Sequence, residues 1–100
     1  SITKINKVKI KPGMVLSNEP GYYKKNHFGI RIENLVYVGK KNGKIFFKNL
    51  TMAPIEKDLI NFNLLTTSEK NYLFKYHMDI YLKISKYLKK NEKKWLASLI

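Results

Sequence analysis

The feature that most constrains the fold of this chain is a change in the spacing of its apolar residues after Pro54. Before that point apolar and polar residues alternate, and a period of two is typical of strands with one buried face. After it, apolar residues recur at intervals of three and four, which is typical of an amphipathic helix. We therefore expect an α+β chain in which an antiparallel β ribbon over residues 1–54 is followed by helices over residues 55–100.

Three turn signals divide the first half. They are Lys11-Pro12-Gly13, Pro20-Gly21 and Asn42-Gly43, the last of which is a strong signal for a two-residue hairpin. The segments between them predict strands over residues 14–16, 29–38 and 45–52. Within the second of these strands, Arg31 and Glu33 are expected to share a face because side chains repeat every two residues.

The second half begins with a capping box, in which Thr66 is followed three residues later by Glu69. We expect a long helix from near Thr67 to residues 89–91, and then a short last helix capped by Asn91. The apolar positions of the two helices are Leu73, Tyr76, Ile80, Ile84 and Tyr87, and then Trp95, Leu96, Leu99 and Ile100. An aromatic stripe is expected to pack in the core; its members are Tyr72, Tyr76, Tyr87 and Trp95.

The net charge of +13 suggests nucleic acid or an anionic surface, but the residue types argue against both. All basic residues except Arg31 are lysine, they are spread along the chain, and bidentate recognition of bases or phosphates favours arginine. We therefore expect no specific nucleic-acid partner. No apolar run approaches the ~18 residues needed to span a bilayer, so we expect no membrane partner either. The absence of cysteine and of a signal-like start suits the cytoplasm.

Acidic residues are scarce in the first fifty positions, where Glu19 and Glu33 are the only two. A carboxylate that interrupts an apolar strand, as Glu33 does, is costly unless a cation or hydrogen-bond donors satisfy it. Without cysteine, any metal ion must be held by carboxylate, imidazole or carbonyl groups. The residues alone leave two interpretations open, a two-carboxylate metal site and simple solvent exposure.

Two motifs at these glutamates resemble a known family. The segments Pro12 to Tyr23, with Asn18-Glu19-Pro20-Gly21 at its centre, and Phe28-Gly29-Ile30-Arg31-Ile32-Glu33 resemble the last metal-binding segment of the Xaa-Pro aminopeptidase (aminopeptidase P) family. These enzymes are dinuclear metallopeptidases with a pita-bread fold. The later segments Leu50 to Ile55, Asp58 to Ile60, Tyr76-His77 and Trp95-Leu96 resemble the helical C-terminal extension of the long cytosolic form. The resemblance implies that residues 1–54 are the C-terminal segment of the pita-bread domain and residues 55–100 are the extension.

The resemblance also implies roles for individual residues. Glu19 corresponds to a ligand of one metal ion, and Glu33 to the carboxylate that bridges two. Tyr23 and Arg31 correspond to a supporting hydrogen-bond shell around these ligands. His27 falls in a variable loop and is expected at the surface, whereas His77 is expected to pack on the helix.

The family needs two aspartates and a histidine as further ligands, and all of them lie upstream of the matching segment. Asp58 and Asp79 cannot replace them by motif. The implied cofactors are two divalent ions, most plausibly manganese, and the implied substrate of the intact enzyme is a peptide with proline at its second position. We expect this chain alone to bind metal weakly and to be inactive. Its start at Ser1 suits a trimmed product or a piece of a longer protein.

A different class of function is a non-catalytic remnant that acts as an oligomerisation module through its helices. Strands whose neighbours are missing expose edges and apolar faces. We therefore expect self-association into a homo-oligomer, or binding to an upstream half of the catalytic domain, in preference to a stable monomer.

Overall fold

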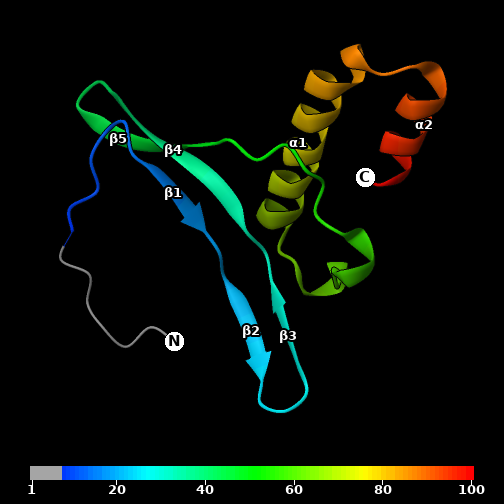
Figure 1. Cartoon of the computed structure of the whole chain (residues 1–100), viewed down its shortest axis with the longest axis horizontal. Helices are drawn as coiled ribbons and strands as arrows, with labels where there is room; N and C mark the ends of the chain where they lie inside the picture. Colours follow the sequence, from blue (N-terminus) through cyan, green and yellow to red (C-terminus); the bar gives the residue numbers. More distant parts are fainter. Residues whose placement is uncertain (1–7) are drawn as a thin grey trace. The chain divides into compact units, whose positions relative to one another are not determined.

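The computed structural model describes residues 8–100 and divides the chain into two compact units (Figure 1). The first unit spans Ser1–Thr51 and contains all the strands, and we call it the β unit. The second spans Met52–Ile100 and contains the helices, and we call it the helical unit. Antiparallel sheets are followed by helices, so the predicted α+β class is confirmed.

From residue 8 onward the β unit contains five strands in two antiparallel sheets. They are β1 (Val15–Asn18), β2 (Gly21–Lys24), β3 (Phe28–Arg31), β4 (Asn34–Lys41) and β5 (Lys44–Asn49). One sheet has the order β1-β4-β5 and the other is the β2-β3 pair. In Figure 1, β2 continues the line of β1 and β4 that of β3, so the two sheets form one long ribbon.

The Asn42-Gly43 hairpin is confirmed. Both residues have positive φ angles, 53° and 78°, as a type I′ turn requires, and Lys41 pairs with Lys44 directly across it. The returning strand β5 ends at Asn49, earlier than the predicted residue 52. Just beyond it the Leu50 N–H still donates to the Leu35 carbonyl at 2.8 Å. Side chains add two further bonds, since the Asn49 amide donates to the Thr51 carbonyl at 2.7 Å and the Thr51 hydroxyl accepts from the Leu35 N–H at 2.8 Å.

The prediction of one uninterrupted strand over residues 29–38 was wrong. The structure has two strands there, β3 and β4, separated by Ile32 and Glu33. Ile30 and Ile32, and then Val36 and Val38, keep the same two-residue period although Asn34 interrupts it, and this pattern predicts one strand. The break lies opposite Glu19 and Pro20, and proline has no N–H with which to continue a ladder.

The helical unit contains α1 (Thr67–Ile84) and α2 (Lys90–Ser98), with single 3₁₀ turns at Lys57–Leu59, Phe62–Leu64 and Ser85–Tyr87. The predicted capping box is confirmed at the start of α1. The Thr66 N–H donates to the Glu69 carboxylate at 2.8 Å, and the Glu69 N–H donates to the Thr66 hydroxyl at 3.1 Å. The backbone and side-chain hydrogen bonds from Thr66 hold the pKa of the Glu69 carboxyl below its ordinary value.

The buried side of α1 is formed by Leu73, Tyr76, His77 and Ile80. Two of these side chains anchor the segment that precedes the helix. The Tyr76 hydroxyl donates to the Ala53 carbonyl at 2.6 Å, and His77 Nε2 accepts from the Ile55 N–H at 3.1 Å. These bonds link residues more than twenty positions apart, so they fix the entry to the helical unit by tertiary contact. Within residues 8–100, no helix is both long enough and apolar enough to cross a bilayer.

Two predicted helix ends were wrong. Helix α1 ends at Ile84 and tightens into the 3₁₀ turn Ser85–Tyr87, and a three-residue spacing such as Ile84 to Tyr87 suits either kind of helix. The last helix is capped by Lys89 and not by Asn91, because the Glu92 carboxylate accepts from the Lys89 N–H at 2.7 Å.

The predicted aromatic stripe was also mostly wrong. Tyr76 is buried, but Tyr72, Tyr87 and Trp95 are 66%, 77% and 64% exposed. In helix α2 the buried position is Leu96, which is adjacent to Trp95 in the sequence, and neighbouring helical residues do not face the same side.

Candidate metal centre

The β2-β3 pair has two chemically different faces. One face carries the pairs Tyr22 with Ile30 and Lys24 with Phe28, and the Tyr22 and Phe28 rings are 6.0 Å apart. The other face carries the pairs Tyr23 with Gly29 and Gly21 with Arg31. Arg31 and Tyr23 therefore lie on the face that bears both glycines of the hairpin.

The strand register brings Glu19 and Glu33 opposite each other. On one side of the break Asn18 pairs with Asn34, and on the other side Gly21 pairs with Arg31. Two residues remain on each chain between these pairs, so the register continues without a bulge. The Ile32 N–H donates to the Pro20 carbonyl at 3.1 Å across the break, which leaves Glu19 directly opposite Glu33.

Two carboxylates at directly opposed positions repel each other when both are ionised. The arrangement is notable in a chain with only seven acidic residues and twenty basic ones. Among residues 8–100, Glu19 makes no hydrogen bond or ion pair, and it is exposed. A divalent cation between the two carboxylates would remove the repulsion, and oxygen donors of this kind suit hard divalent ions.

Arg31 and Glu33 lie on one face, as the sequence predicts. The guanidinium Nη2 and the carboxylate Oε2 are 3.2 Å apart. The two side chains are 51% and 45% exposed, so the ion pair contributes at most about 1 kcal/mol to stability. Its more direct effect is to fix the direction of the Glu33 carboxylate.

The position of Tyr23 depends on two glycines that sequence reasoning did not single out as site residues. Its ring lies against both Gly21 and Gly29, so close that a Cβ at either position would overlap it. The sequence signal that could have found this contact is an aromatic residue paired with glycine across a hairpin.

The donor set within this chain is incomplete. No group of three or more His, Cys, Asp or Glu side chains comes together anywhere in residues 8–100, and residues 1–7 contain none of these types. Glu19 and Glu33 therefore fit a divalent metal centre only as two of its ligands. The remaining ligands would have to come from a segment outside this sequence.

The histidines lie where the sequence places them. His27 is exposed in the turn between β2 and β3, where its backbone N–H donates to the Lys24 carbonyl at 3.0 Å. His77 is 4% exposed, and burial lowers the pKa of its imidazole. Because Nε2 accepts the hydrogen bond from Ile55, the imidazole is neutral and serves as a packing residue.

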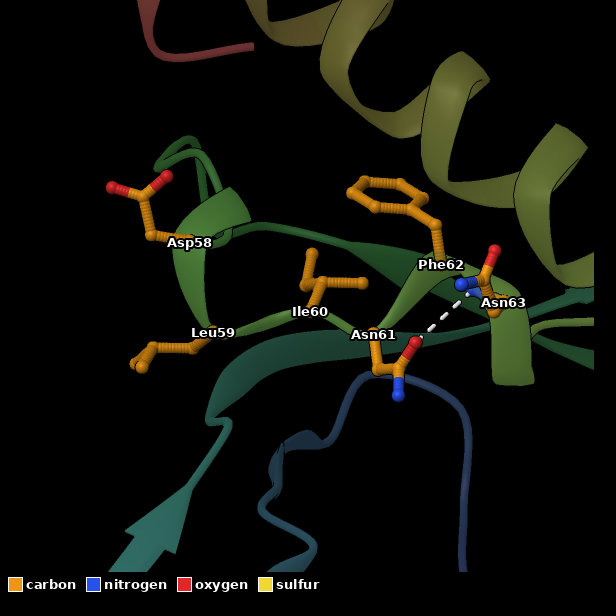
Figure 2. A pocket seen from close by; sticks show the side chains of 6 residues that line it. All are labelled: Asp58, Leu59, Ile60, Asn61, Phe62 and Asn63. Carbon is orange, nitrogen blue, oxygen red and sulfur yellow. Dashed lines mark hydrogen bonds between the residues drawn. The ribbon is translucent and has the colours of Figure 1, made fainter.

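A depression in the helical unit also has polar groups, and it is lined by residues 58–63 (Figure 2). Its Asn61 side chain is already engaged, accepting from the Asn63 N–H at 3.2 Å. Asp58 is the one carboxylate in the lining. A single carboxylate beside amides and apolar side chains gives no basis for a metal or catalytic site.

Comparisons with known proteins agree with this arrangement of the chain. Residues 1–40 match the model of metallopeptidase family M24, and residues 44–99 match the model of the C-terminal region of peptidase M24. The chain is 42% identical to Xaa-Pro aminopeptidase 1 of Dictyostelium discoideum over 95% of its own length. It is also 42% identical to a probable Xaa-Pro aminopeptidase P of Laccaria bicolor over 85% of its length.

A solved structure gives the same result. The chain matches a crystal structure of X-prolyl aminopeptidase from Caenorhabditis elegans, described as a cytosolic enzyme with a di-nuclear active site, with a TM-score of 0.78 and 34% identity. The match covers 90% of this chain and 16% of that enzyme.

This chain is much shorter than the proteins it matches. It spans 17% of the Dictyostelium discoideum protein and 14% of the Laccaria bicolor protein. Nearly all of it is nevertheless matched, residues 1–40 by the peptidase model and residues 44–99, which include β5 and the helical unit, by the model of the C-terminal region. The two family models match residues 1–40 and 44–99, and the sequence and structural matches agree with them, so this chain belongs to metallopeptidase family M24.

Proposed function

We propose that this chain supplies two metal ligands, Glu19 and Glu33, to the dinuclear centre of an Xaa-Pro aminopeptidase. The observation that carries the proposal is the register that sets these two carboxylates opposite each other at a break in the ladder. In this assignment the β unit is the end of the catalytic domain and the helical unit is its C-terminal extension, with the boundary near residue 54.

The names of the relatives supply the substrate class, a peptide whose second residue is proline. The nature of the donors supports manganese, because carboxylates favour hard divalent ions over soft ones. When bound, two such ions would polarise the scissile carbonyl and activate a water molecule for attack.

The residues of this chain would act by holding and orienting. Glu33 would bridge the two ions, and Arg31 would keep its carboxylate in that direction through the 3.2 Å contact. Glu19 would bind one ion from the opposite segment. Tyr23, on the same face of the hairpin, would support the carboxylates through its hydroxyl group.

The proposal is tested by reconstitution from two pieces. The full chain is mixed with the upstream part of a relative, such as the Dictyostelium discoideum enzyme, in the presence of Mn²⁺. The chain alone is expected to cleave no Xaa-Pro peptide, since three of the five family ligands are missing. The mixture is expected to cleave it, and Glu33→Gln is expected to abolish that activity.

Asp79→Asn is the matched control, because Asp79 is an exposed carboxylate on α1 in the helical unit. It is expected to leave the reconstituted activity unchanged. A mixture that retains full activity with Glu33→Gln would overturn the assignment of Glu33 as a ligand. Turnover by the chain alone would overturn the claim that its ligand set is incomplete.

A second candidate function is association through the helical unit, and the exposed aromatic residues favour it. Tyr72, Tyr87 and Trp95 remain largely exposed within this chain. Sedimentation of the full chain at several concentrations tests this function. We expect a concentration-dependent increase in mass that Trp95→Lys weakens, and a monomer at every concentration would contradict it.

A further inference from the structure

The five glycines of the β unit fall into two groups with different physical roles. Gly13 and Gly43 have positive φ angles, 90° and 78°, and nothing lies near the position of a Cβ. They are required by backbone conformation. Gly21, Gly29 and Gly39 do not have such φ angles, and at each of them a Cβ would overlap an aromatic ring. At these three the space is filled by an aromatic ring, that of Tyr23 or Phe46, which would have to shift to admit a Cβ.

One ring, that of Tyr23, occupies the space above two of these glycines. A Cβ on Gly29 would lie 2.6 Å from Cδ1 of the ring, and a Cβ on Gly21 would lie 2.7 Å from the hydroxyl oxygen. Real Cβ contacts essentially never fall below 3.0 Å. The ring therefore lies along the hairpin, with its base over Gly29 and its hydroxyl over Gly21.

The hydroxyl consequently points toward the carboxylates. On this face of the ribbon the successive pairs are Tyr23 with Gly29, Gly21 with Arg31, and then Glu19 with Glu33. Residues two apart on a strand are separated by about 6.6 Å, which is close to the reach of a tyrosine side chain. By lying over Gly21, the hydroxyl is placed one pair away from the two glutamates and beside Arg31.

We propose that Gly21 and Gly29 are positioning residues, whose missing side chains hold the Tyr23 hydroxyl at the carboxylate end of the hairpin and thereby tune metal binding by Glu19 and Glu33. The effect on metal binding depends on the proposed function, whereas the seating of the ring does not. The two parts are therefore tested by separate measurements.

Gly39 and Phe46 provide a matched control within the chain. They pair across β4 and β5, and a Cβ on Gly39 would overlap Cζ of Phe46. In both places an aromatic ring lies over a glycine on the neighbouring strand. This pair is separated along the ribbon from the break that carries Glu19 and Glu33, so its disruption should cost stability without altering the metal ligands.

The first measurement concerns only the position of the Tyr23 ring over Gly21 and Gly29. Labelling glycine at its α carbon gives up to ten signals in a proton–carbon spectrum of the full chain, because the chain has five glycines and each carries two α protons. Protons beneath a ring face are shielded, so Gly21, Gly29 and Gly39 are expected upfield of Gly13 and Gly43. Tyr23→Leu is expected to return the first two to ordinary positions, and Phe46→Leu to return only Gly39. Unshifted Gly21 and Gly29 signals beside a shifted Gly39 signal would show that the Tyr23 ring does not lie over these two glycines.

The second measurement concerns the metal and uses calorimetric titration of Mn²⁺ into the complex of the full chain with the upstream part. Gly21→Ala is expected to weaken Mn²⁺ binding by about 10-fold, the lower end of the effect of removing a supporting partner, and Tyr23→Phe by a similar factor. The double variant is expected to be no weaker than Tyr23→Phe alone, because the glycine acts through the hydroxyl. Gly39→Ala is expected to leave the affinity unchanged.

The outcomes separate the two levels of inference. Additive losses in the double variant, or an equal loss with Gly39→Ala, would show a general structural effect and would overturn the positioning role. Unchanged Mn²⁺ affinity with Glu33→Gln would instead overturn the proposed function, and the position of the Tyr23 ring over Gly21 and Gly29 would remain as a feature of the fold.

Discussion

The β unit and the helical unit are ordered by different means. Four of the five buried hydrophobic side chains of the described residues, Leu73, Tyr76, Ile80 and Leu96, belong to the helical unit. Val38 is the one such residue of the β unit, whose strands otherwise expose most of their large apolar side chains. The β unit relies on its backbone ladder and turn geometry, and the helical unit on side-chain packing. The β unit therefore keeps its strand register, but its exposed apolar faces need further surfaces to cover them.

The largest expected effect breaks the packing of the helical unit. Ile80 is 2% exposed, and Ile80→Ala is expected to reduce the free energy of unfolding by about 2–5 kcal/mol, through lost burial and the cavity left behind. Denaturant unfolding followed by helical circular dichroism measures it. The same type of change at Ile30, which is 46% exposed in the β unit, is expected to cost much less. Equal losses at the two sites would contradict the comparison.

The second effect tests the turn geometry of the β unit. Gly43 has a φ of 78°, and Gly43→Ala is expected to cost about 1–2 kcal/mol because an L-residue is strained in that region. Hydrogen exchange of the β4 and β5 amides reports the loss. Gly43→Asn is the control, since asparagine tolerates left-handed conformations, and it is expected to retain most of the protection. Equal behaviour of both variants would argue against backbone strain as the cause.

A third effect, of about 1 kcal/mol, isolates one tertiary hydrogen bond of the helical unit. Tyr76→Phe keeps the ring but removes the hydroxyl that donates to the Ala53 carbonyl at 2.6 Å. Chemical denaturation measures the change in stability. Tyr72→Phe removes a hydroxyl from an exposed ring and is expected to change stability little. If both variants lose the same amount, the bond to Ala53 has no special role.

The smallest effect is a pH dependence from His77. Burial lowers its pKa in the folded chain, so below the ordinary value of about 6.5 the unfolded chain binds the proton more readily. Stability should therefore fall as the pH drops below about 6.5, and level off below the folded pKa, where both states are protonated.

Unfolding measured between pH 7.5 and 4.5 tests this expectation. His77→Gln should flatten the profile in that window, and the matched exchange at exposed His27 should leave the slope in place. A slope that survives His77→Gln would assign the pH dependence to other groups.

Several elements could be predicted from the sequence because their causes are local. The Asn42-Gly43 turn follows from the φ angles that these residues tolerate, and the capping box at Thr66 and Glu69 follows from groups three residues apart. The shared face of Arg31 and Glu33 follows from the two-residue period of a strand, and their ion pair agrees with it. The assignment of Glu19 and Glu33 as ligands came from motif resemblance and stays a prediction.

Other features depended on contacts that no local pattern encodes. The break at Ile32 and Glu33 is set by the opposing segment at Pro20, and the end of α1 at Ile84 by a choice between two helix types of similar spacing. The exposure of Tyr72 and Trp95 depends on which helix faces find partners. The sequence by itself determined that strands are followed by helices, several of the turns and caps, and the family, since propensity, turn chemistry and motif act over a few residues; it did not predict β2 (Gly21–Lys24) or the division between β3 and β4. Only the tertiary structure decided that Glu19 faces Glu33 and that Tyr23 lies over two glycines, because these depend on the register between segments about ten residues apart.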